Sequence, residues 1–353
     1  MDFGICIAKI DEVGIIAHAE NLGYSHAWVA DSQMIWSDCY AVLALAAQQT
    51  RTIRLGTGVS VVGTRIAPVT AHSIATINRL APGRTFLGIG TGNTAMRLMG
   101  QRPVRLAAYE EYLKIVRALL NGEQVDYTQG GITAPIQMLM LEQEFMAVQP
   151  PIPIYVSGFG PKAQRLAGAY GDGLVMSIPP EPGFMTRARN NVVAGAKACG
   201  RALPQNFHFS SLTTAVLLEP GENLTSERVI RECGPFVTSS LHYIYERVRE
   251  GGEPPARVRN IWNTYTALME QTPERQRHMR IHDGHCTYLH PDEAQFVTPE
   301  MIRATCLAGR PGEVIEQVRA LAAAGLQHLI LLPALDAFNS VLESFTRQVM
   351  EKL

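Results

Sequence analysis

The chain has 353 residues, of which 46% are hydrophobic and 18% are charged, and its formal net charge is -1 at pH 7. This balance gives no electrostatic basis for binding nucleic acid or an acidic membrane surface. The six cysteines are scattered and form no CxxC pair, which favours reduced thiols and predicts a cytoplasmic protein. We find no signal peptide and no apolar run long enough to span a bilayer, so no membrane partner is expected.

Short apolar runs alternate with amphipathic helical patterns along the chain. The predicted strands are 3–8, 26–30, 53–60, 85–90, 152–157, 173–178, 207–218 and 328–333. The predicted helices are 11–22, 39–49, one with Pro68 at its first position, 107–121, 161–170, 182–199, a mostly helical stretch after 218, and 338–352. Asp11 is expected to cap the first of these helices.

Regular alternation of strands and helices predicts a parallel sheet with helical crossovers. Eight such units are the number in a (β/α)8 TIM barrel, and we favour this fold over an open doubly wound sheet. Residues 1–353 are expected to form a single domain with insertions after strands 4 and 7. The first, 122–151, carries the turn signal Gly130-Gly131 of a hairpin. The second, 219–310, is expected to cover the mouth of the barrel.

Three predicted strands end in loops rich in glycine. These loops read Thr57-Gly58-Val59-Ser60, Gly90-Thr91-Gly92-Asn93 and Ser157-Gly158-Phe159-Gly160. Because glycine has no Cβ, main-chain N–H groups in such loops can approach a flat ring or a phosphate closely. In a barrel the carboxyl ends of the strands form one face. The sequence therefore predicts a shared ligand-binding face.

The motifs HAWVADS (26–32), RLGTGVSVVGTRIAPVTAHSIATI (54–77), GRTFLGIGTGN (83–93) and IPIYVSGFGPKAQRLAGAYGDGLV (152–175) occur in this order. In sequence and spacing they resemble the bacterial luciferase-like superfamily of flavin- and deazaflavin-dependent oxidoreductases. The match is nearest to its short, methylenetetrahydromethanopterin reductase-like branch. The resemblance spans residues 1–180 and the last strand and helix, and it fades through 219–305.

The resemblance implies that the cofactor is held by residues at the ends of the strands. In the family, Asp31 would lie beside the isoalloxazine ring, and Gly58-Val59 would form a non-prolyl cis peptide that supports the face of the ring. Thr91, Gly92 and Asn93 would contact the pyrimidine edge or the ribityl chain. The run Ser157, Gly158, Phe159 and Gly160, before a helix that starts at Pro161, would hold a phosphate through free N–H groups and the helix dipole. The alternative for Asp31 is a helix cap.

Two residues after Asp31 bear on the substrate pocket. Deazaflavin-dependent sugar and alcohol dehydrogenases of the superfamily place a histidine base directly after this aspartate, but this chain has Ser32. A hydroxyl of ordinary pKa is a poor general base at neutral pH, so alcohol oxidation of that type is disfavoured. Trp36 could form an aromatic wall of the pocket or serve ordinary packing. No catalytic residue is assigned.

Several histidines and a cysteine gather between 278 and 290. Their spacing lacks HExxH, and no second ligand pair completes a four-ligand metal site, so no metal is predicted. His282 and His285 are instead expected to line the substrate pocket, with helix capping as an equal alternative.

These features predict a luciferase-like flavin-dependent monooxygenase that uses reduced FMN, supplied by a separate flavin reductase, on a small organic substrate. The first alternative is hydride transfer with the deazaflavin coenzyme (F420) and without oxygen, which the GFGP loop fits equally well. A non-catalytic flavin-binding protein and a metal-dependent barrel hydrolase are further alternatives. A homodimer is also expected, because Ala41, Ala44 and Ala47 appear on several faces of the helix 39–49.

Overall fold

The computed structural model describes residues 1–177 and 182–353, which form two compact units. Unit 1 comprises Met1–Met176 and Thr186–Ser210. Unit 2 comprises Ser211–Leu353 and the described residues of Ser177–Met185. Residue 178, the predicted end of the sixth strand, lies outside the described residues.

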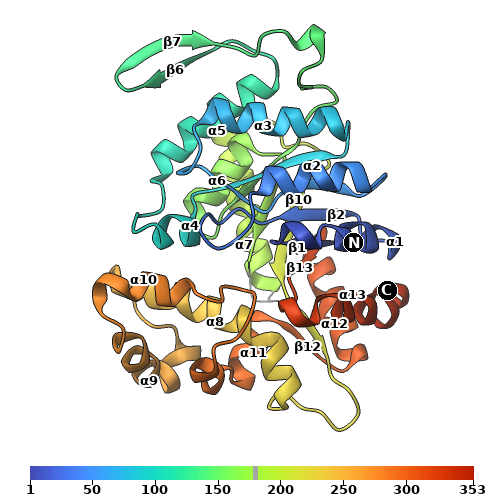
Figure 1. Ribbon diagram of the computed structural model, residues 1–353, viewed down its shortest axis with the longest axis vertical. Helices are drawn as coiled ribbons and strands as arrows, with labels where there is room; N and C mark the ends of the chain where they lie inside the picture. Colours follow the sequence, from blue (N-terminus) through green and yellow to red (C-terminus); the bar gives the residue numbers. More distant parts are fainter. Residues whose placement is uncertain (178–181) are drawn as a thin grey trace. The chain divides into compact units, whose positions relative to one another are not determined.

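Strands and helices alternate along the chain as the sequence predicts (Figure 1). The eight barrel strands are β1 (Asp2–Ile7), β2 (His26–Val29), β3 (Arg54–Thr57), β5 (Thr85–Gly90), β8 (Ile154–Ser157), β9 (Gly173–Met176), β10 (His208–Thr213) and β13 (His328–Leu331). All belong to one sheet, and within unit 1 the pairs β1–β2, β2–β3, β3–β5, β5–β8 and β8–β9 are parallel. The fold is the predicted (β/α)8 barrel and not an open doubly wound sheet.

Most predicted helices are present within one or two residues of their expected bounds. The helices that alternate with the barrel strands are α1 (Gly14–Asn21), α2 (Cys39–Gln49), α3 (Ala67–Leu80), α5 (Leu106–Leu120), α6 (Pro161–Tyr170), α7 (Pro182–Ala198), α12 (Pro311–Ala323) and α13 (Phe338–Gln348). The prediction that Asp11 caps the first helix is wrong. Asp11 lies in the 3-10 turn Ile10–Glu12 and pairs with Lys9 at 3.3 Å, and α1 begins after that turn.

Aromatic rings fill the interior of unit 1. The ring centroids of Trp28 and Phe86 are 4.5 Å apart, and those of Phe86 and Tyr155 are 5.2 Å apart. A β-carbon on Gly56 would lie 2.3 Å from the Phe86 ring. These rings come from β2, β5 and β8, so strand positions without a side chain make room for the large residues beside them.

The predicted strand 207–218 is divided in the structure. β10 ends at Thr213, and β11 (Ala215–Leu217) pairs in parallel with β12 (Leu307–Gly309) in a separate two-stranded sheet. The division arises because the main chain changes its partner. The carbonyl of Thr213 accepts from the N–H of Leu332, whereas the carbonyl of Thr214 accepts from the N–H of Leu307.

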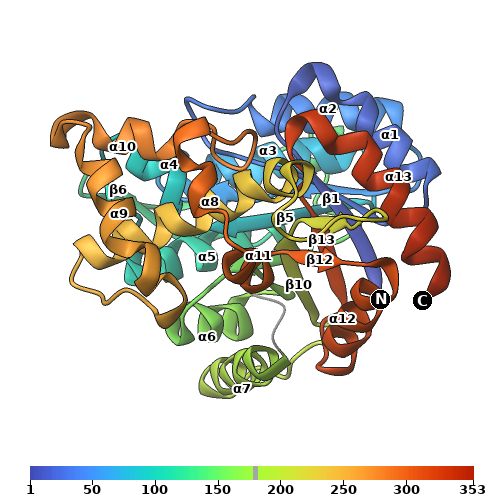
Figure 2. The same ribbon diagram turned by 90° about the horizontal axis from the view of Figure 1, so that it is seen from below.

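Both predicted insertions are present. After the fourth barrel strand and α5, β6 (Val125–Gln129) and β7 (Ile132–Ile136) form an antiparallel hairpin, and both glycines of its turn have positive φ. After the seventh barrel strand, helices dominate the insertion (Figure 2). They are α8 (Glu227–Arg249), α9 (Arg259–Glu270), α10 (Glu274–His282) and α11 (Pro299–Thr305), with a 3-10 segment η4 (Pro291–Phe296). That this insertion covers the barrel mouth remains a prediction.

The burial of the α2 alanines bears on the expected homodimer. Ala47 is buried, so it cannot contribute to the proposed partner surface of α2, whereas Ala41 is exposed and Ala44 is half-buried.

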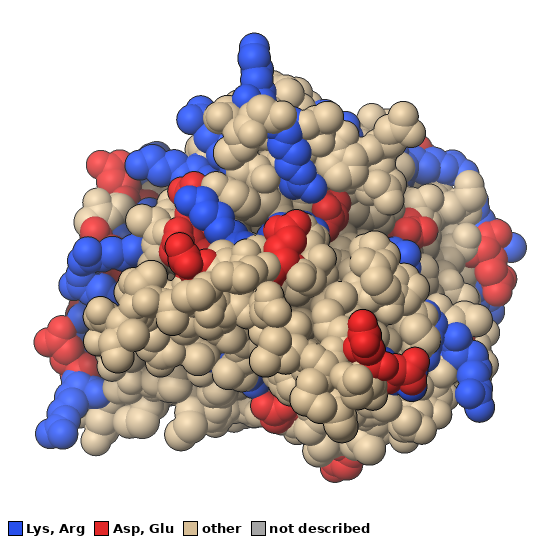
Figure 3. Space-filling model, turned by 90° about the horizontal axis from the view of Figure 1, so that it is seen from above, with Lys and Arg blue, Asp and Glu red and all other residues tan. Residues whose placement is uncertain are grey.

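Basic and acidic side chains are interspersed over the face drawn in Figure 3. Among the described residues, none of the helices is both long enough and apolar enough to cross a bilayer.

Candidate cofactor-binding face

The predicted cofactor-binding segments follow adjacent parallel strands of unit 1, so they lie at one edge of the sheet. Gly90, the last residue of β5, shows how close they are. A β-carbon built on Gly90 would lie 2.9 Å from Val59 Cγ2 and 3.2 Å from Ser157 Cβ. The structure therefore brings the segments after β3, β5 and β8 together, and their contact with a cofactor remains a prediction.

The peptide bond between Gly58 and Val59 is cis, as the resemblance implies. The N–H of Gly58 donates to the carbonyl of Val29 at 2.6 Å. A β-carbon on Gly58 would lie 2.8 Å from Trp28 Cβ, so the main chain here packs directly against β2. The chain then enters the short strand β4 (Ser60–Val61), which pairs with β5.

Asp31 is not a helix cap. The residue is buried, and the residue that caps α2 is Asp38, which accepts hydrogen bonds from two main-chain N–H groups. Asp31 Oδ2 accepts from the N–H of Val61 at 3.1 Å and from Arg65 Nη1 at 2.6 Å. Asp31 Oδ1 accepts from Gln33 Nε2 at 2.6 Å. The carboxylate therefore joins the end of β2 to β4 and to the segment before α3.

Arg65 is a residue that the sequence analysis missed. Its Nη2 donates to Asp38 Oδ2 at 2.8 Å, and its guanidinium carbon lies 5.0 Å from the centroid of the Tyr40 ring. Burial by itself would lower the pKa of the Arg65 guanidinium, but the Asp31 carboxylate raises that pKa above its usual value. A buried carboxylate requires a cationic or hydrogen-bonding partner. That rule, applied to Asp31, indicates a basic partner elsewhere in the chain, and Arg65 lies in the motif 54–77.

Ser32 and Trp36 form a turn between β2 and α2. The carbonyl of Ser32 accepts from the N–H of Trp36 at 3.1 Å, and the serine side chain is buried while the indole is half-buried. Neither residue belongs to the helix that follows. Their place beside a substrate remains a prediction.

The loop after β5 differs from the expected open loop. A short helix, α4 (Asn93–Leu98), begins at once, because Gly92 adopts φ +77 and turns the chain. The side-chain oxygen of Asn93 accepts from Arg97 Nε at 2.9 Å, and the carbonyl of Thr91 accepts from the N–H of Val104 at 3.1 Å. These three loop residues are half-buried, which leaves part of each accessible.

The loop after β8 leads straight into α6, as predicted. Gly160 is the N-cap residue, and a β-carbon built there would meet no atom within 4 Å. Phe159 is 46% exposed, and its carbonyl accepts from Gln164 Nε2 at 3.2 Å. The buried Gln164 side chain in turn accepts from Asn191 Nδ2 at 2.8 Å. These two side-chain amides, which the sequence analysis missed, link the loop to α6 and α7 and so fix its position.

His282 and His285 belong to unit 2. His282 Nε2 lies 3.1 Å from Glu246 Oε1, and both side chains are buried. Burial lowers the pKa of His285 well below its usual value. Within residues 1–177 and 182–353, no three His, Cys, Asp or Glu side chains are placed to hold a metal ion. Contact of the two histidines with a substrate remains a prediction.

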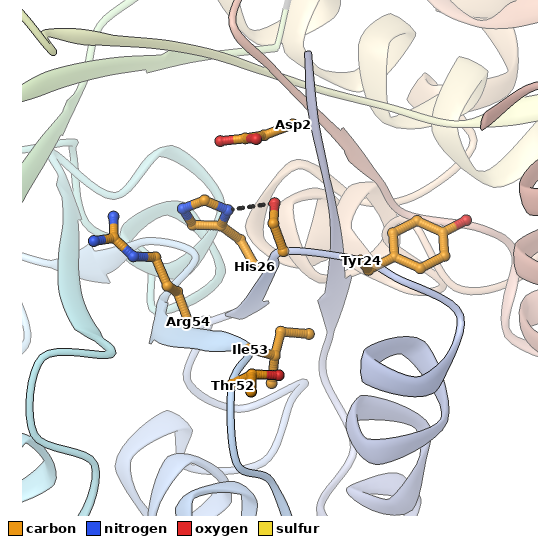
Figure 4. A pocket seen from close by; sticks show the side chains of 7 residues that line it. Asp2, Tyr24, His26, Thr52, Ile53 and Arg54 are labelled. Atoms are coloured by element: carbon orange, nitrogen blue, oxygen red, sulfur yellow. Dashed lines mark hydrogen bonds between the residues drawn. The ribbon is translucent and has the colours of Figure 1, made fainter. Parts of the chain in front are cut away.

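A pocket lies at the other ends of the strands of unit 1 (Figure 4). It is lined by Asp2, Tyr24, Ser25, His26, Thr52, Ile53 and Arg54. His26 Nδ1 lies 2.8 Å from Ser25 Oγ, and burial lowers the pKa of His26 to about 3. Because these residues precede or begin the strands, this pocket is separate from the face formed by the strand ends.

A family model described as luciferase-like monooxygenase matches residues 9–328. The chain is similar to 5,10-methylenetetrahydromethanopterin reductase of Methanolobus tindarius, with 34% identity over 210 residues that cover 57% of this chain and 61% of that protein. The corresponding reductase of Archaeoglobus fulgidus is 25% identical over 88% of this chain and 86% of its own length. An F420-dependent hydroxymycolic acid dehydrogenase of Mycobacterium tuberculosis is 32% identical over 53% of this chain and 54% of that protein.

Solved structures are similar over the whole chain. The F420-dependent tetrahydromethanopterin reductase of Methanopyrus kandleri has a TM-score of 0.73 at 21% identity and covers 99% of both chains. The oxygenating constituent of 3,6-diketocamphane monooxygenase of Pseudomonas putida, in complex with FMN, has a TM-score of 0.62 at 18% identity and covers 100% of this chain and 98% of that chain. These likenesses concern the fold and agree with the barrel described above.

Proposed function

This chain belongs to the luciferase-like monooxygenase family and is an oxidoreductase, and from that membership we propose that it transfers hydride with the deazaflavin coenzyme F420. The observation that carries the proposal is the identity of the relatives. Those above 30% identity are named as a methanopterin reductase and an F420-dependent dehydrogenase, whereas FMN is named for a structure at 18% identity. The relatives thus favour the first alternative of the sequence analysis over an FMN-dependent monooxygenase.

The loop after β8 fits the phosphate of such a coenzyme. Gly160 leaves open space at the start of α6, and the first helical turn presents the N–H groups of Lys162 and Ala163, which have no acceptor within the helix. N–H groups at a helix N-terminus and the helix dipole attract an anion. We propose that Ser157, Gly158, Phe159 and Gly160 hold the phosphate there.

The remaining strand-end residues would hold the ring system and its polyol chain. We propose that Gly58 and Val59 support the ring face, beside Asp31, and that Thr91, Gly92 and Asn93 contact its edge. A bound deazaflavin supplies a carbon that accepts or gives a hydride. The protein orients the coenzyme and the substrate and excludes water from them.

The residue after Asp31 bears on the direction of the reaction. Ser32 stands where related alcohol dehydrogenases have a histidine base, and its hydroxyl is poorly suited to remove a proton from an alcohol. The Asp31 carboxylate already accepts three hydrogen bonds, so its role is to hold structure. We therefore propose reduction of a small organic substrate that lies beside Ser32 and Trp36, and a substrate contact of His282 or His285 is a separate proposal.

Binding of the purified protein to F420 and to FMN, followed by fluorescence, tests the proposal. Tight binding of F420 with weak or no binding of FMN is the expected result. Tight binding of FMN alone, with oxygen consumption when a flavin reductase supplies reduced FMN, would establish the monooxygenase instead. Stoichiometric binding of the coenzyme, without any turnover of reduced F420 or NAD(P)H on a panel of substrates, would favour a non-catalytic carrier.

Two further expectations remain proposals. We propose that the protein forms a homodimer through the exposed face of α2 and that it acts in the cytoplasm. A separate flavin reductase is a partner only for the FMN-dependent alternative.

A further inference from the structure

Arg65 is held from several sides at the cofactor-binding face. Its two terminal nitrogens donate to different carboxylates, Asp31 at 2.6 Å and Asp38 at 2.8 Å. Its guanidinium lies over the Tyr40 ring, and its carbonyl accepts from Tyr112 Oη at 2.9 Å. Each contact restricts a different part of the residue, so the guanidinium has one defined orientation.

The contacts of Arg65 form a closed ring with the strand after the cis peptide. Tyr40 Oη lies 3.1 Å from Ser60 Oγ, and the next residue, Val61, donates its N–H to Asp31. Asp31 accepts from Arg65, and Arg65 stacks on Tyr40. The ring therefore links the end of β2, the first turn of α2 and β4.

The ion pair between Asp31 and Arg65 is shielded from water. The aspartate side chain is 2% exposed and the arginine side chain 15% exposed, so water can replace little of the lost interaction. Removing the cation would leave the carboxylate buried without its charged partner, which is costly. The hydrogen bond between this carboxylate and the Val61 N–H, one of the side-chain contacts that hold β4, would then be less well fixed.

We infer that Arg65 is a positioning residue that holds the Asp31 carboxylate in place and thereby fixes the Ser60–Val61 segment for cofactor binding. The inference rests on the proposed function. Arg65 acts through Asp31 and Tyr40, and no direct contact with the coenzyme is required of it.

The test measures the dissociation constant of F420 at pH 7 in the wild type, Arg65→Met, Arg65→Lys, Asp31→Asn and Arg65→Met/Asp31→Asn. Arg65→Met should bind roughly tenfold or more weakly, the expected loss for a charged hydrogen bond. Arg65→Lys should recover part of the affinity. The double variant should lose less than the two single losses combined, because Arg65 acts through Asp31. Asp38→Asn, which removes the more exposed partner, is the matched control and should stay within about threefold of the wild type.

Several results would overturn the inference. They are wild-type affinity in Arg65→Met, additive losses from Arg65→Met and Asp31→Asn in the double variant, and no recovery in Arg65→Lys when all variants melt cooperatively. If Arg65→Met does not fold, Arg65→Gln takes its place with the same expected results. Failure of the wild type to bind F420 would instead count against the proposed function. A double-mutant cycle of urea midpoints for Asp31 and Arg65 then still tests their coupling, and additive effects would refute it.

Discussion

His242 in α8 and Glu293 in η4 are joined by a hydrogen bond of 2.8 Å, although their side chains are only 2% and 1% exposed. One turn further along α8, Glu246 Oε1 lies 3.1 Å from His282 Nε2 of α10. Helix α8 thus supplies the histidine of one histidine–glutamate pair and the glutamate of the other. The second insertion is therefore held together by specific polar contacts as well as by apolar packing.

Replacing Glu293 by alanine should lower the free energy of unfolding by about 3–5 kcal/mol, because one member of a buried pair is left without its partner. The exposed pair Arg319–Glu316 provides the control, and Glu316→Ala should change stability by less than about 1 kcal/mol. Urea denaturation at pH 7 measures both. Equal effects of the two substitutions would show that the buried pair has no special weight.

Glu20 should make stability depend on pH in the acid range. Burial favours the protonated form, but hydrogen bonds from the N–H groups of Arg51, Thr52 and Ile53 outweigh it and lower the pKa of Glu20 to about 2 from 4.5. The unfolded state therefore binds more protons between these two values. The stabilisation is complete above pH 4.5 and is lost as the pH falls toward 2.

Glu20→Gln removes this contribution. The difference in urea midpoint between the wild type and the variant should be largest at pH 7 and should shrink from pH 4.5 to pH 3. A difference that stays constant over this range would mean that the charge of Glu20 is unimportant and that only its shape matters.

Gly160→Ala should separate coenzyme binding from folding. A β-carbon at this position meets no protein atom within 4 Å, and φ is −96, so alanine fits without strain. The added methyl group would occupy space proposed for a phosphate, and F420 affinity should fall by roughly tenfold, the equivalent of about 1.4 kcal/mol. The melting temperature should be unchanged.

Gly312 is the matched control, because it also lies beside a helix-starting proline and has open space around a built β-carbon. Gly312→Ala should leave F420 affinity as it is. If both variants bind like the wild type, the phosphate does not lie at Gly160.

Ala44→Glu tests the proposed dimer. The residue is half-buried on α2, next to Leu45, which is 43% exposed. A charge here should disrupt an apolar contact between subunits and reduce the mass from twice to once that of the monomer. Light scattering at micromolar concentration measures the mass, with Ala107→Glu, at an exposed alanine of α5, as the control. A wild-type protein of monomer mass would end this proposal.

The strands and their glycine-rich ends could be predicted because both depend on local pattern. Buried strands read as continuous apolar runs, and the glycines at their ends leave the backbone open. The helix α4 was missed because it is only six residues long and depends on a left-handed turn at Gly92. Its sequence alone resembles a continuing loop.

The side-chain pairs were missed for a different reason. Asp31 and Arg65 are 34 residues apart, and His242 and Glu293 are 51 residues apart. Neither separation follows a helical or strand period. Only the fold brings such residues together, although the rule that buried charges require partners indicates that some partner exists. For the same reason the sequence predicts a pocket position for His282 and does not reveal its partner Glu246.

The pairing of β11 with β12 has a consequence for how the second insertion can change. Ala215 lies opposite Leu307, and Leu217 lies opposite Gly309, so the polypeptide between them leaves and returns at one small sheet. Insertions or deletions within this excursion need not shift the register of either strand or of β10 before them. The segment between β11 and β12 can thus change in length while the two strands that frame it stay paired.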